Sequence, residues 1–244
     1  MLVIPEHEIR RHGPGRSLLT ILWRQFWTER RLGQRGIHFR GASLEQVLRA
    51  YTAMDATEFD NINARQDWAN WRTIPRALSG NVPDRPLRVL DIGCGTGSST
   101  RVLAHYCAAG SHLTGYEYAE PLLVYARRRD YRHRSGAPAR VDFVCQGVTE
   151  PFAEPDGSVD LVNASGIIGH HLTLETFQPL LTELVRILKP DGLAILDPGP
   201  TLTAPTLAAV MQGAEFTQQG HYFSWFGDPC GAMVFRRGTS EPEA

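Results

Sequence analysis

The residues best suited to chemistry lie in a glycine-rich turn. Residues 89–97 read VLDIGCGTG, an apolar run with one acid, Asp91, that passes into three glycines at alternate positions. Glycine reaches positive φ and lets a backbone approach a ligand closely. A helix that follows such a turn offers unpaired N–H groups to an anion. The pattern predicts a ligand-binding loop, and its alternative is a tight strand-to-helix turn that binds nothing.

A second acid ends the next apolar run. Glu117 lies 20 residues after the last glycine of the turn, and Tyr118 follows it. A carboxylate at the end of the second strand of such a sheet can accept hydrogen bonds from a ribose diol. Tyr118 is placed to cover an adenine face. These two residues predict a nucleoside-containing ligand, against the alternative of a solvated charge at a strand end.

Four stretches in this order resemble class I S-adenosylmethionine-dependent methyltransferases. Residues 90–97 are similar to the first motif of that family, and residues 115–118 (GYEY) to its acidic second motif. Residues 155–162 (PDGSVDLV) resemble the entry to its fourth strand, and residues 188–192 (LKPDG) the turn before its fifth. The resemblance implies a Rossmann-like, doubly wound α/β sheet of seven strands that ends in an antiparallel hairpin. It also implies S-adenosylmethionine as the cofactor.

The resemblance places the cofactor at the ends of four strands. The cofactor-binding residues that it implies are Asp91, Gly93, Cys94, Gly95, Gly97, Glu117, Tyr118, Gly147, Val148, Ala164 and Ser165. The chain departs from the family pattern after the third strand, where the family often has an aspartate and this sequence reads QGVT at residues 146–149. There, adenine would be held by the Val148 backbone or by the Gln146 side chain.

Alternating strands and helices must position these residues. Apolar runs predict strands at Arg88–Ile92, His112–Glu117, Val141–Cys145, Val159–Ala164 and Leu193–Leu196, and a hairpin from Phe216–Phe226 and Ala232–Arg237. Helical periodicity predicts helices at Ser99–Ala109, Pro121–Arg129 and Leu174–Leu188. This alternation is typical of a parallel sheet with right-handed crossovers.

Residues 1–80 predict a helical cap ahead of the Rossmann-like domain at residues 81–244. We expect helices at Ser17–Arg31, at Ser43–Met54 with Ser43 as its N-cap, and from near Glu58, with Pro75 ending or kinking the third helix.

Several cap residues have two interpretations. Tyr51, Trp68 and Trp71 could line a lid, although we expect two of the three to pack the cap onto the core. Arg72 is either a partner for a carboxylate or a solvated side chain. The apolar stripe from Leu18 to Trp27 is interpreted as core or a dimer contact, with a membrane-surface helix as the alternative.

Two histidines are the candidate catalytic residues. His170 and His171 follow the fourth predicted strand, where a substrate would face the transferred methyl group. An imidazole titrates near neutral pH and suits a general base, which methyl transfer needs only when the nucleophile arrives protonated. Alternatively, one histidine packs on the next helix and the other is solvated.

Composition excludes several classes of protein. The chain has 244 residues, 42% of them hydrophobic, and a net charge of −1, which gives no general field for nucleic acid. An arginine cluster near residue 130 is interpreted as a solvated face, with an RNA contact as the alternative. Its members are Arg127, Arg128, Arg129, Arg132 and Arg134.

The four cysteines show neither C-x-x-C pairing nor zinc-ligand spacing, so we expect no metal and free thiols in a reducing cytoplasm. No apolar run is long enough to span a membrane, and the N-terminus does not resemble a signal peptide. Only one of the 25 basic residues is lysine, which we attribute to a GC-rich, bacterial genome.

We therefore expect methyl transfer to an O, N or C nucleophile of a small molecule. The alternatives are an RNA or protein methyltransferase and a non-catalytic subunit that only binds the cofactor. A nicotinamide-binding domain would need glycine or alanine at Ser98, and a P-loop would need a lysine after the turn. A homodimer is left open.

Overall fold

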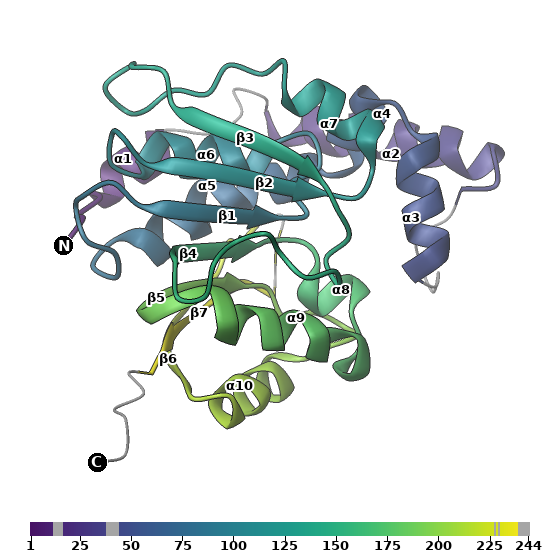
Figure 1. The fold of residues 1–244 in the computed structure, drawn as a ribbon. Coiled ribbons are helices and arrows are strands. Elements are labelled where there is room, and N and C mark those ends of the chain that lie inside the picture. The colour runs from purple at the N-terminus through teal and green to yellow at the C-terminus, as the bar shows by residue number, and fades with distance from the viewer. Residues whose placement is uncertain (12–16, 38–43, 227, 229, 239–244) are drawn as a thin grey trace, which may run out of the picture.

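The structure is a computed structural model that describes residues 1–11, 17–37, 44–226, 228 and 230–238. A seven-stranded sheet runs through it in the order β3-β2-β1-β4-β5-β7-β6, as Figure 1 shows. The strands β1 to β5 pair in parallel, whereas β7 is antiparallel to both β5 and β6. The strands are β1 Arg88–Ile92, β2 His112–Glu117, β3 Arg140–Cys145, β4 Val159–Ala164, β5 Leu188–Leu196, β6 Phe216–Tyr222 and β7 Ala232–Arg237. The predicted fold class, including the terminal hairpin, is confirmed.

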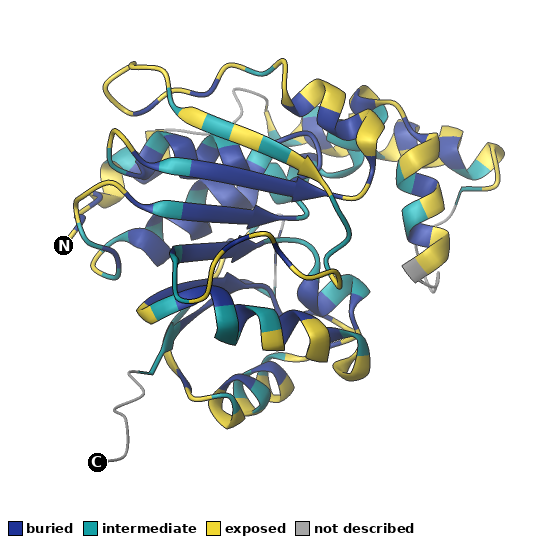
Figure 2. Cartoon of the chain, in the orientation of Figure 1, coloured by how far each residue is buried: buried dark blue, intermediate teal, exposed yellow. Residues whose placement is uncertain are grey.

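Helices cover both faces of the sheet. They are α1 Glu6–Arg11, α2 Leu18–Gln34, α3 Leu44–Ala53, α4 Ala56–Ile62, α5 Ala64–Leu78, α6 Ser98–Tyr106, α7 Glu120–Ala126, α8 Ile168–His171, α9 Leu174–Ile187 and α10 Ala204–Gly213. Figure 1 shows α5 and α6 behind the sheet and α9 in front of it. The central strands are therefore buried on both sides, whereas the edge strand β3 is largely exposed (Figure 2).

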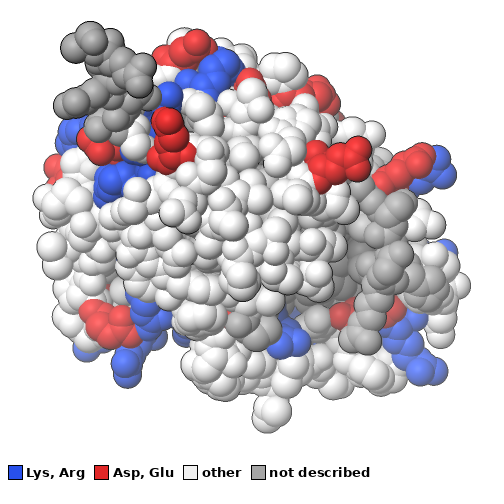
Figure 3. Space-filling model, turned by 90° about the horizontal axis from the view of Figure 1, so that it is seen from below, with Lys and Arg blue, Asp and Glu red and all other residues white. Residues whose placement is uncertain are grey.

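Surface charge is mixed rather than gathered into one sign. The face in Figure 3 carries acidic and basic residues side by side around a broad uncharged centre. Four of the five clustered arginines have acidic partners, in the pairs Arg127–Glu120, Arg129–Asp60, Arg132–Asp130 and Arg134–Glu8. These partners neutralise most of the cluster, which disfavours the RNA interpretation.

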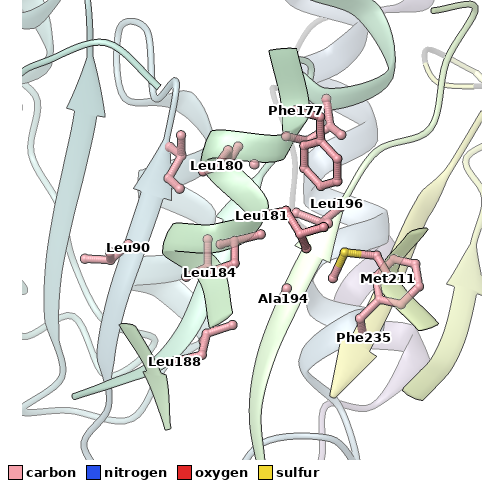
Figure 4. Packing of buried hydrophobic residues seen from close by; sticks show 14 of the residues in the cluster. Leu90, Phe177, Leu180, Leu181, Leu184, Leu188, Ala194, Leu196, Met211 and Phe235 are labelled. Atoms are coloured by element: carbon pink, nitrogen blue, oxygen red, sulfur yellow. The ribbon is translucent and has the colours of Figure 1, made fainter. Parts of the chain in front are cut away.

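Alternate residues of the central strands pack into two hydrophobic cores, one on each face of the sheet. Leu90 and Val162 pack with α9 and α10, whereas their neighbours Val89 and Leu161 pack with α5 and α6 on the other face. Side chains of a strand point to opposite faces in turn, so one apolar run supplies both cores. Figure 4 shows the first core, where leucines of α9 at helical spacing meet Leu196 and Phe235.

Three details of the cap differ from expectation or lie outside the described residues. The structure has two helices, α4 and α5, where one helix was expected, and they meet at Asn63. Helix α4 begins two residues before the expected start near Glu58, because Asp55 and Glu58 form a capping box there. Pro75 does not end α5, which continues to Leu78 because its last turn is buried against the core. The proposed N-cap Ser43 lies outside the described residues.

The apolar stripe of α2 is not core. Its buried residues are Ile21, Thr28 and Leu32, while Leu19 and Trp23 face outward. The interpretation of the Leu18–Trp27 stripe as core is wrong, because helix periodicity shows that a face is apolar but not which neighbour covers it. The other two interpretations of the stripe, a dimer contact and a membrane-surface helix, stay predictions. Among the described residues, no helix has the length and apolar content that a membrane crossing requires.

Candidate active site

A cavity of about 210 Å³ opens at the carboxyl ends of β1 to β4, beneath helices α3, α4 and α5. Ligand sites of open α/β sheets lie at this edge, where successive crossovers diverge. The loops after the four strands supply one wall, and the cap helices supply the other. Residues far apart in the sequence, such as Tyr51, Glu117 and His171, therefore face one space.

The glycine turn after β1 is shaped for close approach. Gly95 has a φ of 54°, and a Cβ placed there would lie 2.6 Å from the Phe59 ring. The ring of this cap residue therefore packs directly on the turn. Thr96 donates a 2.5 Å hydrogen bond to Asp60, which also pairs with Arg129. The backbone of the turn and helix α4 consequently form one surface.

Asp91 braces the turn from below. It is fully buried, and its carboxylate accepts hydrogen bonds from Ser99 (2.7 Å), Thr100 (2.5 Å) and Asn163 (2.8 Å). Burial raises the pKa of Asp91, while these hydrogen bonds act in the opposite direction. The residue does not line the cavity, so its contacts tie β1, β4 and the start of α6 together.

Glu117 is the principal acid of the cavity. Its two oxygens accept backbone hydrogen bonds from Gly95 (3.0 Å) and Ala119 (2.9 Å), which fix the carboxylate at the end of β2. Burial raises the pKa of Glu117, and both backbone donors lower it. Each carboxylate oxygen keeps a further lone pair that can accept a hydroxyl of a ribose.

A polar stripe of the cap faces the same space. The cavity is lined by Asn63, which caps α5, and by Gln66, Asp67 and Asn70 within that helix, at positions three or four residues apart. With Glu117 and Glu150, Asp67 makes three carboxylates in the lining, and no arginine or lysine is among the described residues there. This donor set fits S-adenosylmethionine, whose sulfonium and ammonium groups are cationic. The backbone at Ser98 and Ser99, where α6 begins, can bind its carboxylate.

Of the two candidate catalytic histidines, the structure brings only His171 to the cavity. Its Nε2 lies 3.2 Å from the Tyr51 hydroxyl, within hydrogen-bonding distance. Burial, and to a smaller degree the neighbouring His170, lowers the pKa of His171 to about 4, so the imidazole is neutral at physiological pH. His170 is not part of the lining, and its Nε2 lies 3.4 Å from buried Asp197 instead.

The proposed cofactor residues divide into two groups. Those that line the cavity are Gly93, Cys94, Glu117, Tyr118, Gly147, Val148 and Ser165. Those that do not are Asp91, Gly95, Gly97 and Ala164. Gly97 caps α6 in the left-handed conformation, and Ala164 packs in the core.

The third-strand loop is arranged around Glu150. This carboxylate accepts the Gly147 N–H at 3.1 Å and lines the cavity with Val148. The Gln146 amide donates to the backbone oxygens of Glu150 and Pro151, so its N–H group is engaged within the loop. Of the two adenine contacts that we considered, the Val148 backbone is therefore the better placed.

The lid hypothesis holds for one aromatic residue of three. Tyr51 lines the cavity, whereas Trp68 packs on Phe226 and Trp71 packs on His105 and Tyr106. Arg72 lies over the Trp68 ring at 3.4 Å and is not part of the lining. Phe59 and the polar stripe of α5 were not predicted from the sequence, although amides and an acid at helical spacing in an otherwise buried helix were a usable signal.

Comparisons with known proteins agree with this geometry. Residues 89–192 match the family model described as a methyltransferase domain. The chain is 33% identical over 150 residues to a ubiquinone biosynthesis O-methyltransferase of Maricaulis maris. The matched segment covers 57% of this chain and 50% of that protein. It is 36% identical over 150 residues to a demethylmenaquinone methyltransferase of Clavibacter sepedonicus, covering 57% and 55%. The chain thus spans about half the length of these relatives.

A solved structure shows the same fold. It is described as a putative S-adenosyl-L-methionine-dependent methyltransferase of Methanococcus maripaludis, with a TM-score of 0.55 and 14% identity over 78% of this chain and 94% of that one.

Proposed function

We propose that this chain, whose residues 89–192 are an S-adenosylmethionine-dependent methyltransferase domain of class I, transfers a methyl group to a small uncharged acceptor. The observation that carries the proposal is the single cavity in which the acid Glu117, the turn at Gly93 and the apolar cap residues meet. Bound there, S-adenosylmethionine supplies an activated methyl group with its own leaving group.

The lining supports a small acceptor over a nucleic acid. Val47, Leu48, Ile167 and Leu172 give the cavity an apolar side. The three carboxylates in the lining would repel a phosphate backbone or another anionic substrate. The names of both relatives refer to small molecules, one to ubiquinone biosynthesis and the other to demethylmenaquinone, which agrees with this charge argument.

We assign His171 the role of proton acceptor and Tyr51 that of its positioning partner. A neutral imidazole can accept a hydrogen bond from a hydroxyl or amine of the acceptor and take its proton as the new bond forms. The contact with Tyr51 holds the ring in one orientation. Leu48 and Leu172 line the same cavity and would leave less water beside the reacting atoms once the acceptor is bound.

Calorimetry tests cofactor binding, and mass spectrometry tests transfer. We expect S-adenosylhomocysteine to bind while a pyridine dinucleotide does not. We also expect phenolic and quinol acceptors to gain 14 mass units, and His171→Gln to lower kcat with little change in cofactor affinity. Binding of the dinucleotide alone would show that the assignment is wrong.

The acceptor atom and the location of the protein are further proposals. An oxygen acceptor is favoured because the Tyr51–His171 pair suits a hydroxyl that must lose a proton. All four cysteines are free thiols, which supports a reducing cytoplasm. A non-catalytic binding subunit is disfavoured because its cavity would need no neutral imidazole in the lining beside an apolar wall.

A further inference from the structure

Helix α2 presents an apolar face to solvent. Five side chains at helical spacing are between 43% and 79% exposed: Leu19, Leu22, Trp23, Phe26 and Trp27. We call these five residues the α2 face. The opposite side of the helix, with Ile21 and Leu32, is buried against the rest of the cap. The helix therefore has two apolar sides, and packing within the chain uses only one.

The α2 face is comparable in area to the largest apolar patch on a typical monomer, which is often a functional surface. Aromatic side chains have about 150–250 Å² each to bury, so the five residues together expose on the order of 500 Å². Contiguous exposed apolar patches of several hundred Å² often mark sites of interaction with another molecule. A specific partner is therefore expected here.

A second segment brings aromatic residues to the same corner. Phe226, in the connection between β6 and β7, packs with Leu18 and Ile21 at the start of α2. Its neighbour Trp225 is 80% exposed, and Phe223 is 56% exposed. Phe226 thus joins the β6–β7 connection, which carries these two exposed rings, to the buried side of α2.

The charged residues of α2 indicate what kind of partner binds the α2 face. The helix carries three exposed arginines, Arg24, Arg30 and Arg31, and one acid, Glu29, which accepts a hydrogen bond from Gln25. A second copy of the chain would bring the same cations against each other, which disfavours self-association through this face. Arg24 and Arg31, seven residues apart, lie along one edge of the apolar stripe, and Arg30 lies at its C-terminal end. An anionic surface complements both these arginines and the stripe.

We propose that α2 lies in the headgroup region of an anionic lipid bilayer, with the α2 face inserted and the three arginines beside lipid phosphates. Amphipathic helices with aromatic and leucine side chains on one face and arginines flanking it bind membranes in this way. Helix α2 packs on α4 and α5, which line the cavity. The bound protein would therefore hold its cavity within a few helix diameters of the lipid.

Vesicle sedimentation with the full chain tests the proposal. Phosphatidylcholine vesicles with and without 30% phosphatidylglycerol would be compared, with tryptophan fluorescence as a second readout. We expect binding to the anionic vesicles with a blue shift of emission, and much weaker binding to the neutral ones. Removing two cations with Arg24→Gln and Arg30→Gln should weaken binding by about fivefold per arginine.

Matched variants distinguish vesicle binding through the α2 face from non-specific adsorption of the protein. Trp23→Ser with Trp27→Ser should reduce binding at least tenfold, while Tyr125→Ser on α7, which is 46% exposed like Trp27, should leave it unchanged. Melting temperature and S-adenosylhomocysteine affinity should stay the same in every variant, so failure here is distinct from failure of the proposed function. Equal binding by the tryptophan variant and the unaltered chain would overturn the proposal. So would a dimer in light scattering that the tryptophan substitutions abolish.

Discussion

Replacing His171 with glutamine should make the protein more resistant to acid. In the folded chain burial holds the pKa of His171 near 4, while in the unfolded chain it returns to 6.5. Between these two values the unfolded state binds more protons. The free energy of unfolding therefore falls as the pH falls from 6.5 towards 4, and this contribution is absent above pH 6.5.

The loss of unfolding free energy at low pH follows from how far the pKa of His171 is lowered in the folded chain. Each pH unit within the window costs about 1.4 kcal/mol, so the histidine removes about 2 kcal/mol of stability at pH 5 and about 3 kcal/mol at pH 4. Glutamine places its amide near the position of Nε2 and can keep a hydrogen bond to Tyr51. It has no group that titrates in this range.

Urea unfolding at pH 7.5 and pH 5 measures the difference. We expect the unaltered chain to lose about 2 kcal/mol more than His171→Gln between the two pH values. His7→Gln, at an exposed position of α1, is the matched control and should follow the unaltered chain. If His171→Gln and the unaltered chain lose the same stability, the imidazole is not held neutral by burial, and the argument for its role fails.

Three further substitutions test the cofactor edge of the cavity. Glu117→Ala should weaken S-adenosylhomocysteine binding in calorimetry by about 10- to 100-fold, because hydrogen bonds to a charged group contribute roughly 1.5–3 kcal/mol each; unchanged affinity would remove Glu117 from the site. Asp91→Ala should lower the free energy of unfolding by about 3 kcal/mol, since three donors lose a buried acceptor; a loss below about 1 kcal/mol in urea titrations would contradict its bracing role. Gly97→Ala should lower the free energy of unfolding by about 2 kcal/mol or more, because φ is 84° and the new Cβ would lie 2.0 Å from the Tyr131 hydroxyl. A melting temperature equal to that of the parent would show that the turn adapts.

The cap couples folding of the N-terminal helices to the shape of the site. Phe59 packs on the turn at Gly95, and Asp60 bonds both Thr96 and Arg129. These contacts join α4 to the glycine turn and to the segment after α7. The polar stripe of α5 then completes the cavity opposite Glu117. The cap is consequently part of the binding surface, while the boundary near residue 80 stays a prediction.

The sequence by itself determined the parts that depend on local pattern. Glycines at alternate positions after an apolar run, and an acid at the end of the next run, specified the turn and Glu117, because positive φ at glycine and the end of an apolar run are local properties of the chain. The carboxyl ends of β1 to β5 were predicted correctly, whereas β5 begins at Leu188, five residues before its predicted start, and β6 ends at Tyr222, four residues before its predicted end. The alternation of Val89 and Leu90 between two cores also follows from strand geometry alone.

Tertiary structure decided which side chains face the cavity. Two adjacent histidines are equivalent in sequence, yet His171 meets Tyr51 of a helix 120 residues earlier while His170 turns to Asp197. Two apolar sides of α2 are likewise equivalent in pattern, and only packing on the rest of the cap selects the side that is buried. Contacts between distant segments depend on the relative placement of whole helices, which hydrophobic periodicity does not encode.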